Sequence, residues 1–180
     1  VALQRCTTAR EAILLMGELI KKYGYADSGE CLTIADPNEV WHFEVFGEGP
    51  DKIGGVWAAV RIPDDHVGVS ANIPRISTLN LKDKDNYMAS ENVFEVAKKL
   101  GYWDGKEPFK FWKAYSGRKA FSVREFFILD YLAPSLNLDY EAEELPISVK
   151  PEKQVSVTDV MALLRQTYEG TKWDITQNLK

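Results

Sequence analysis

The sequence predicts an α+β fold in which helices pack on an antiparallel sheet. An amphipathic helical pattern opens the chain, short segments rich in Val, Ile, Trp and Phe follow it, and capped helical patterns fill the second half. The short segments are separated by only a few residues, which is too little for the crossover that parallel strands require. This order of helix, strands and helices is typical of α+β proteins.

The first helix is predicted from the residues that would begin and end it. Thr8 and Glu11 have the spacing of a capping box, and Gly24 is suited to end a helix. Between them, apolar residues recur with a helical period, which predicts an amphipathic helix. These residues are Ala12, Ile13, Met16, Leu19, Ile20 and Tyr23.

A meander of short strands is predicted next. The strands cover residues 30–35, 40–46, 56–61 and 67–70. In the second strand Trp41, Phe43 and Val45 lie on one face, and the other face carries Val40, His42, Glu44 and Phe46. Because apolar side chains lie on both faces, both need to be covered, and the predicted helices do not suffice for this. We therefore expect either a sandwich completed by further chain or a partner protein.

Three more helices are predicted in the second half, each beginning at a serine cap and ending near a glycine or a proline. They span residues 91–100, 123–133 and 157–168, after the caps Ser90, Ser122 and Ser156. The stretch 80–105 is otherwise polar, and we interpret it as an insertion or a connector. Residues 139–144 are acidic and are expected to form a surface loop.

Length and charge limit the classes of partner. The 180 residues are 45% hydrophobic, which suits a single domain over residues 1–180. The formal net charge of −5 gives no electrostatic reason to expect nucleic acid, and no apolar run approaches the ~20 residues of a membrane span. The chain begins at Val1 without a basic segment followed by an apolar one, so its localisation stays open.

The histidines and cysteines show none of the common spacings of metal or cofactor sites. Cys6 and Cys31 lie outside any CxxC or Cys/His cluster, and the chain has no HExxH, DxDxDG or glycine-rich phosphate loop, so we expect no metal and no cofactor. We interpret both cysteines as small buried apolar groups. His42 is expected to be a hydrogen-bonded sheet residue, and His66 a solvated turn residue.

The segment 70–76, Ser-Ala-Asn-Ile-Pro-Arg-Ile, combines two groups that act in catalytic sites. It places Asn72 and Arg75 at a predicted strand end, next to a proline. A side-chain amide can donate to an oxyanion, and a guanidinium can hold a carboxylate. An asparagine before a proline is also common in simple turns, so the residues alone leave both interpretations open.

Several motifs in the same order resemble the dipeptidase A-type cysteine dipeptidases. They are TAREAI at 8–13, YGY at 23–25, ADPNEVW at 35–41, RIPDD at 61–65, SANIPRI at 70–76, LAPS at 132–135, DVM at 159–161 and YEGT at 168–171. The resemblance covers most of the chain. It implies an N-terminal-nucleophile hydrolase with an αββα sandwich, similar to penicillin V acylases and bile salt hydrolases. In that design the first residue, a cysteine, attacks the substrate and its own α-amino group serves as base.

The resemblance also implies roles for individual residues. Asn72 matches the asparagine that binds the oxyanion, and Arg124 is our choice for the arginine near the nucleophile, with Arg118 as its competitor. Arg75 is expected either to steer a substrate carboxylate or to form a surface salt bridge. Residue 1 is valine, so the nucleophilic cysteine is not in this chain, and we interpret the chain as an interior fragment of a larger peptidase.

Three hypotheses of function follow. The first is a portion of a cysteine-type dipeptidase that acts on dipeptides, with the remainder of the same protein as its partner and with homo-oligomers possible. The fragment alone would then be inactive, because it lacks the nucleophile. The second is a non-catalytic binding module that uses the 5 Trp, 8 Tyr and 8 Phe residues as a surface. The third is a thiol enzyme that uses Cys6 or Cys31.

Overall fold

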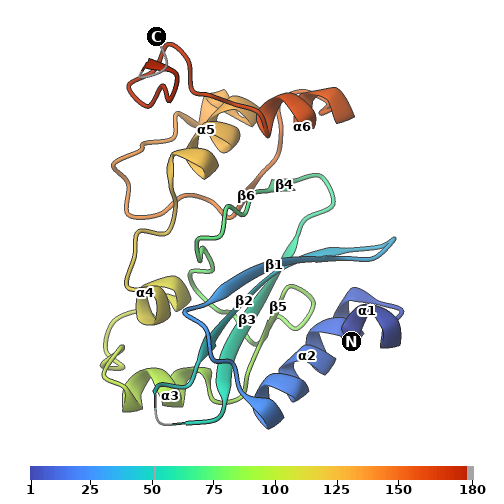
Figure 1. Ribbon diagram of the computed structural model, residues 1–180, viewed down its shortest axis with the longest axis vertical. Helices are drawn as coiled ribbons and strands as arrows, with labels where there is room; N and C mark the ends of the chain where they lie inside the picture. The colour runs from blue at the N-terminus through green and yellow to red at the C-terminus, as the bar shows by residue number, and fades with distance from the viewer. Residues whose placement is uncertain (51, 178–180) are drawn as a thin grey trace.

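A four-stranded antiparallel sheet lies at the centre of the computed structural model, which describes residues 1–50 and 52–177 (Figure 1). Its strand order is β1-β2-β3-β5, and all neighbours pair antiparallel. These strands are β1 (Glu30–Ala35), β2 (Val40–Gly47), β3 (Gly55–Ile62) and β5 (Tyr87–Ala89). The α+β class and the first three strands of the predicted meander are therefore confirmed.

The predicted fourth strand does not belong to this sheet, so that part of the meander was wrong. Residues Val67–Gly68 form β4, which pairs with β6 (Ser148–Val149) in a separate two-stranded sheet. The reason is competition for the free edge of β3, because Ala58 and Val60 of that edge pair with Ala89 and Tyr87 of β5. No edge is left there for the segment after residue 66.

The helices predicted from capping boxes form at the predicted places. In α2 the Thr8 side chain accepts a hydrogen bond from the Glu11 backbone, and the Glu11 carboxylate accepts from the Thr8 backbone. The same reciprocal bonds begin α5 and α6. The helices are α1 (Ala2–Arg5), α2 (Ala9–Tyr23), α3 (Val93–Lys99), α4 (Phe111–Ser116), α5 (Val123–Leu132) and α6 (Val157–Leu163), with a 3-10 turn η1 (Pro134–Leu136).

Two helix boundaries differ from the prediction. Helix α3 begins later than expected and Ser90 does not cap it, because the Ser90 hydroxyl accepts a hydrogen bond from the Trp57 backbone of β3 instead. Helix α6 ends at Leu163, whose side chain is the only buried one that the helix contributes, so the residues beyond it have little packing to keep them helical. None of the described helices could cross a membrane, because none is long and apolar enough.

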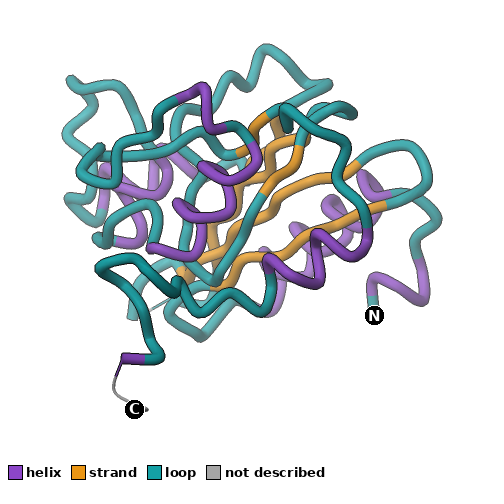
Figure 2. The backbone as a smooth tube through the Cα atoms, turned by 90° about the horizontal axis from the view of Figure 1, so that it is seen from above, coloured by secondary structure: helices purple, strands orange, loops and turns teal. Residues whose placement is uncertain are grey.

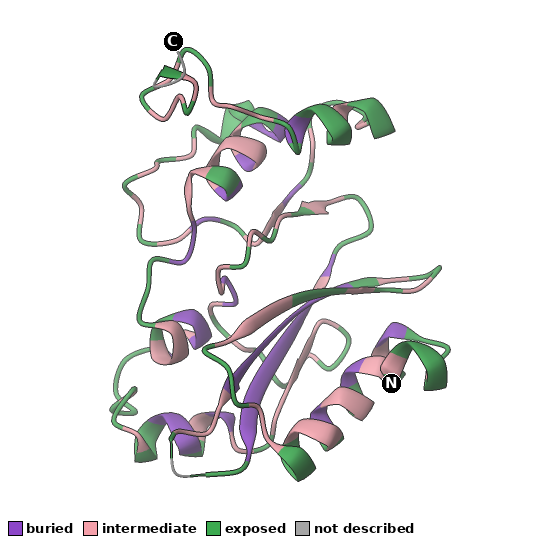
Figure 3. Cartoon of the chain, in the orientation of Figure 1, coloured by how far each residue is buried: buried purple, intermediate pink, exposed green. Residues whose placement is uncertain are grey.

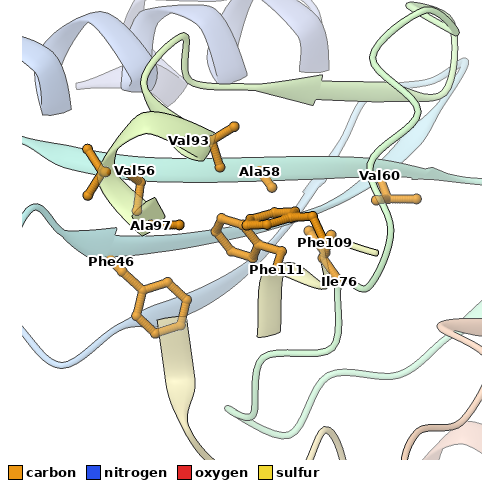
Figure 4. Close-up of a cluster of buried hydrophobic side chains, with 10 residues drawn as sticks. Phe46, Val56, Ala58, Val60, Ile76, Val93, Ala97, Phe109 and Phe111 are labelled. Carbon is orange, nitrogen blue, oxygen red and sulfur yellow. The ribbon is translucent and has the colours of Figure 1, made fainter. Parts of the chain in front are cut away.

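The middle strands β2 and β3 are buried on both faces, whereas the edge strand β1 is partly exposed (Figure 3). Helix α2 packs on one face (Figure 1), where the buried residues are Ala9, Ile13, Trp41, Phe43, Val45, Trp57 and Ala59. The opposite face packs against α3 and α4 (Figure 4), with Phe46, Val56, Ala58, Val60, Ile76, Val93, Val96, Ala97, Phe109 and Phe111 buried. The predicted helices alone do not cover the second face, because the unpredicted α4 and the segment around Ile76 contribute to its buried cluster. The expectation of further chain or a partner against the sheet stays a prediction.

A third buried cluster lies away from the central sheet. It joins α5 and α6 to β6, and Figure 1 shows these elements beside one another at one end of the molecule. Figure 2 shows the strands from above, with helices on both sides of them. Its buried residues are Phe121, Leu129, Leu132, Ala133, Leu145, Val149 and Leu163. The segment from β4 to Ile76 lies between this cluster and the sheet, and that segment contains the candidate site.

The close contact between α2 and the sheet gives a test of this packing. A Cβ atom added at Gly17 would lie 2.7 Å from the Trp57 ring. That ring is stacked on Phe43, with ring centroids 5.5 Å apart, so it has little freedom to move aside. We expect Gly17→Val to lower the free energy of unfolding by about 1–3 kcal/mol, measured by urea denaturation.

The matched control is Glu18→Val on the exposed face of the same helix. It adds the same β-branched side chain without a steric conflict, and it should change stability by no more than about 0.5 kcal/mol. Equal losses in the two variants would contradict the close packing of α2 on Trp57.

Candidate functional site

Asn72 is exposed and has an unusual backbone conformation. Its φ of 59° lies in the left-handed region, which asparagine tolerates better than most residues but which costs of order 1–3 kcal/mol outside glycine. Such a conformation persists only where neighbouring contacts enforce it. The strand expected to run to residue 70 ends at Gly68, so Asn72 lies in a turn four residues after β4 rather than at the strand end itself.

Contacts before Asn72 come from the start of α5. The backbone N–H of Ala71 donates to Glu125 Oε1 at 3.1 Å, and the Ala71 carbonyl accepts from Arg124 Nη2 at 2.5 Å. Glu125 is fully buried, and its other oxygen accepts from the Ser122 backbone and hydroxyl. One capping glutamate therefore fixes both the beginning of α5 and the residue before Asn72.

Contacts after Asn72 come from the central sheet. Glu44 Oε1 on β2 accepts hydrogen bonds from the backbone N–H groups of Arg75 at 2.5 Å and Ile76 at 3.0 Å. The same oxygen lies 2.8 Å from His42 Nε2. Glu44 has no exposed surface. The Ile76 side chain is buried in the apolar cluster that includes Ala58 and Val60 of β3 (Figure 4). The segment that contains Asn72 is thus held at both ends by buried carboxylates.

Arg75 is only 2% exposed and points into the protein. Its guanidinium donates to the carbonyls of Val69 at 2.8 Å, Pro146 at 2.5 Å and Ile147 at 3.4 Å. The expectation of a surface salt bridge was therefore wrong, because backbone carbonyls rather than a surface carboxylate hold this group. Burial lowers the pKa of Arg75, and the carboxylates of Glu125 and Glu44 oppose that change.

The two arginines that competed for the place near the nucleophile lie in different surroundings. Arg124 is exposed, and its guanidinium donates a hydrogen bond to the carbonyl of Ala71, the residue before Asn72. Arg118 is also exposed, and its guanidinium has no hydrogen bond or ion pair with the described residues. The geometry therefore brings Arg124, and not Arg118, to the Asn72 segment.

Cys31, His42 and Glu44 lie close together on the sheet, which the sequence did not predict. Cys31 is the cross-strand neighbour of Glu44, and one ligand atom from each residue lies within 4.8 Å of the others. Thiolate, imidazole and carboxylate suit a transition metal. Here, however, His42 Nε2 and Glu44 Oε1 already bond each other, and the charge of Arg75 acts on the same carboxylate, so we assign these residues no metal.

The remaining cysteine and histidine positions also differ from expectation. Cys6 and Cys31 are half-buried rather than buried. Burial raises the pKa of the Cys31 thiol, and the nearby carboxylates of Glu44 and Glu30 raise it further, which disfavours a nucleophilic thiolate. His66 closes a turn, as expected, because its backbone N–H donates to the Pro63 carbonyl at 3.0 Å, but its ring is half-buried and its Nδ1 lies 3.0 Å from Ser148 Oγ. His42 is the hydrogen-bonded sheet histidine that was expected.

A cavity of about 610 Å³ runs along the chain that leads to Asn72. Its wall includes the stretch 66–70 and His42, on the same sheet face as Glu44. Pockets of this size are common ligand sites. The lining of the cavity ends at Ser70, two residues before Asn72, and Asn72 itself is not part of it.

The environment of Cys31 predicts low reactivity. Because its thiol pKa is raised, the neutral form persists at alkaline pH where a free cysteine is already a thiolate. At pH 8.5 we expect iodoacetamide to label Cys31 in the native protein at least about tenfold more slowly than in the denatured protein, measured peptide by peptide by mass spectrometry. Equal labelling rates in the two states would contradict the assigned environment.

Comparisons with known proteins extend over the whole chain. The sequence model of peptidase family C69 matches residues 1–180. The chain is 32% identical over 172 residues to a probable dipeptidase of Latilactobacillus sakei, which covers 93% of this chain and 35% of that protein. It is 30% identical over 175 residues to probable dipeptidase B of Streptococcus pyogenes serotype M1, and the aligned region covers 94% of this chain and 33% of that protein. The chain is 32% identical over 181 residues to a probable dipeptidase of Salmonella dublin, and the aligned region covers 97% of this chain and 40% of that protein.

The chain thus spans between 33% and 40% of the length of these relatives. The family match includes the segment 70–76 and the residues of α5 that contact it. Both the motifs in the sequence and the match over its full length lead to the same assignment: the chain belongs to peptidase family C69.

Proposed function

We propose that this chain is one domain of a larger cysteine-type dipeptidase with the αββα fold of N-terminal-nucleophile hydrolases. The nucleophilic cysteine would lie outside these 180 residues, and Asn72 would stabilise the oxyanion. The observation that best supports this is the exposed Asn72 in a left-handed conformation, fixed on both sides by Glu44 and Glu125. The dipeptidase names of the relatives and the family of the chain support the reaction and the substrate class.

The proposed reaction is acyl transfer through a thioester. The cysteine thiol gives its proton to its own α-amino group, and the sulfur attacks the carbonyl carbon of the peptide bond. Negative charge develops on the carbonyl oxygen, where the Asn72 amide donates a hydrogen bond. The C–N bond then breaks, the leaving amine takes the proton, and water hydrolyses the thioester. Asn72 suits its role because a preorganised donor needs no rearrangement as the charge forms.

Arg124 is proposed to support the same site. Its guanidinium holds the Ala71 carbonyl and places a positive charge next to Asn72. Arg75 was expected to steer a substrate carboxylate, and that role stays a prediction. Its contacts with three backbone carbonyls give better support to a role inside the protein, where it ties the Val69 and Pro146 segments together.

The non-catalytic alternative has less support, because most aromatic side chains pack on one another. Phe109 contacts three other rings edge to face, and Phe46, Phe111 and Tyr115 pack together beside it. Such rings build the core rather than an exposed recognition surface. Self-association of the protein stays a proposal.

The first test is Asn72→Ala in the product of the complete reading frame that contains this chain. If the amide stabilises the oxyanion, turnover of dipeptides should fall by about 10²–10³-fold while KM changes little. Active sites are counted with a thiol-directed probe, so that misfolded molecules do not enter the rate. The control is Asn80→Ala, another exposed asparagine, which should keep wild-type turnover. Equal turnover per site for Asn72→Ala and wild type would remove Asn72 from the mechanism.

A second test separates the two arginines. Arg124→Ala removes the guanidinium that bonds the Ala71 carbonyl, so turnover per site should fall by about tenfold or more, the size of one charge-assisted hydrogen bond. Arg118→Ala removes an exposed guanidinium without such contacts and should stay within about threefold of wild type. The reverse order of the two effects would show that Arg118 is the arginine at the site.

A further inference from the structure

We propose that Glu44 is a positioning residue for this reaction, and that it acts by fixing the main chain that orients Asn72. The inference rests on the proposed function. Glu44 is fully buried within β2, so it has no surface with which to touch a substrate. Its contact with the site is the pair of hydrogen bonds that it accepts from the backbone of Arg75 and Ile76.

The location of Glu44 shows that a carboxylate is not needed there for packing. Its neighbours on this sheet face include Phe46 and its cross-strand partner Ala58, both part of a buried apolar cluster. A leucine of similar size would avoid the cost of removing a charge from water, which amounts to several kcal/mol per buried ion, but it would leave the backbone N–H groups of Arg75 and Ile76 without their acceptor. The contacts that hold the carboxylate converge on Oε1, which accepts from the backbone of Arg75 and Ile76 and lies 2.8 Å from His42 Nε2, whereas the buried Oε2 has no hydrogen-bond partner among the described residues. The charge of Arg75 acts on the same carboxylate.

The distance along the chain from Glu44's contacts to Asn72 is short. Only Ile73 and Pro74 separate Asn72 from Arg75, and the proline ring fixes φ at its position. The Ala71 backbone on the other side is fixed by Glu125 and Arg124. With both ends held, the left-handed turn at Asn72 has little freedom. If the Glu44 end is released, the turn can relax and the amide moves, and a displacement of about 1 Å can cost on the order of 10² in rate.

The test compares Glu44→Leu and Glu44→Gln in the product of the complete reading frame. Leucine removes Oε1, the oxygen that accepts both backbone hydrogen bonds, whereas glutamine keeps one carbonyl oxygen for these two donors. We expect Glu44→Leu to lower kcat per titrated site by about 10- to 100-fold with KM within about threefold of wild type. Glu44→Gln should restore kcat to within about threefold of wild type. A residue that only maintained the fold would change the yield of folded protein and not kcat per site.

A double-mutant cycle with Asn72→Ala tests the route of the effect. If Glu44 acts through Asn72, adding Glu44→Leu to Asn72→Ala should lower kcat no further than about twofold. Losses that multiply would overturn the inference, because Glu44 would then act independently of Asn72. Unchanged kcat in Glu44→Leu alone would overturn it as well. The proposed function fails separately, if Asn72→Ala keeps full turnover or if the wild-type protein does not hydrolyse dipeptides.

Glu48 provides a matched control, because it follows the same strand and is also largely buried. Its carboxylate pairs with Lys52 at 2.8 Å and accepts from Asn92, not from the Asn72 segment. Glu48→Leu should therefore keep wild-type kcat per site, whatever it does to stability.

If Glu44→Leu yields no folded protein, Glu44→Asp decides the question. Aspartate keeps the charge but draws the oxygens back by one methylene, so kcat should be lower than in Glu44→Gln, which keeps the reach without the charge. Aspartate equal to or better than glutamine would overturn the inference.

Discussion

The carboxylate of Glu44 connects the rigid part of this protein to its candidate site. One oxygen accepts from the backbone of Arg75 and Ile76, and the same oxygen bonds His42 on its own strand. A buried charge is tolerated only where such donors surround it. The segment that follows Asn72 therefore needs Glu44 for its hydrogen bonds, and Glu44 needs that segment to offset the loss of water. This mutual dependence couples the conformation of an exposed turn to the packed sheet.

Arg75 connects the same segment to residues 146 and 147, which lie about 70 positions later in the sequence. Its guanidinium joins the carbonyl of Val69 to those of Pro146 and Ile147, next to the short pairing of β4 with β6. Both of those strands are only two residues long, so their pairing alone is weak. The hydrogen bonds of the buried Arg75 to three backbone carbonyls add to the pairing of β4 with β6 and stabilise the contact between the two segments. The cluster around α5 and α6 is thereby tied to the segment from β4 to Ile76, which lies between this cluster and the central sheet.

Local patterns predicted the regular elements well, and the site less well. The capping box at Thr8 and the bounds of β1 depend on neighbours in sequence, so the sequence alone contains the information. The pairing of β3 with β5 was missed, because a three-residue strand has no pattern of its own and forms where an edge is free. The cap Ser122 was predicted from the sequence, but the bond of Glu125 to Ala71 spans 54 positions and needs the tertiary fold. The segment around Asn72 was singled out from its residues, but only the resemblance to a family favoured an oxyanion role over a simple turn, and that role stays a prediction.

The charges around residues 71–76 balance in a way that suits an oxyanion site. Two buried carboxylates close to a developing negative charge would oppose the proposed reaction if nothing compensated them. Arg75 supplies one positive charge from inside the protein, and Arg124 supplies another at the Ala71 carbonyl. Arg75 offsets the charge of the carboxylates more effectively than Arg124 does, because Arg75 is buried and solvent screens the exposed Arg124. The carboxylates can thus fix the backbone on both sides of Asn72 without leaving an uncompensated field at its amide.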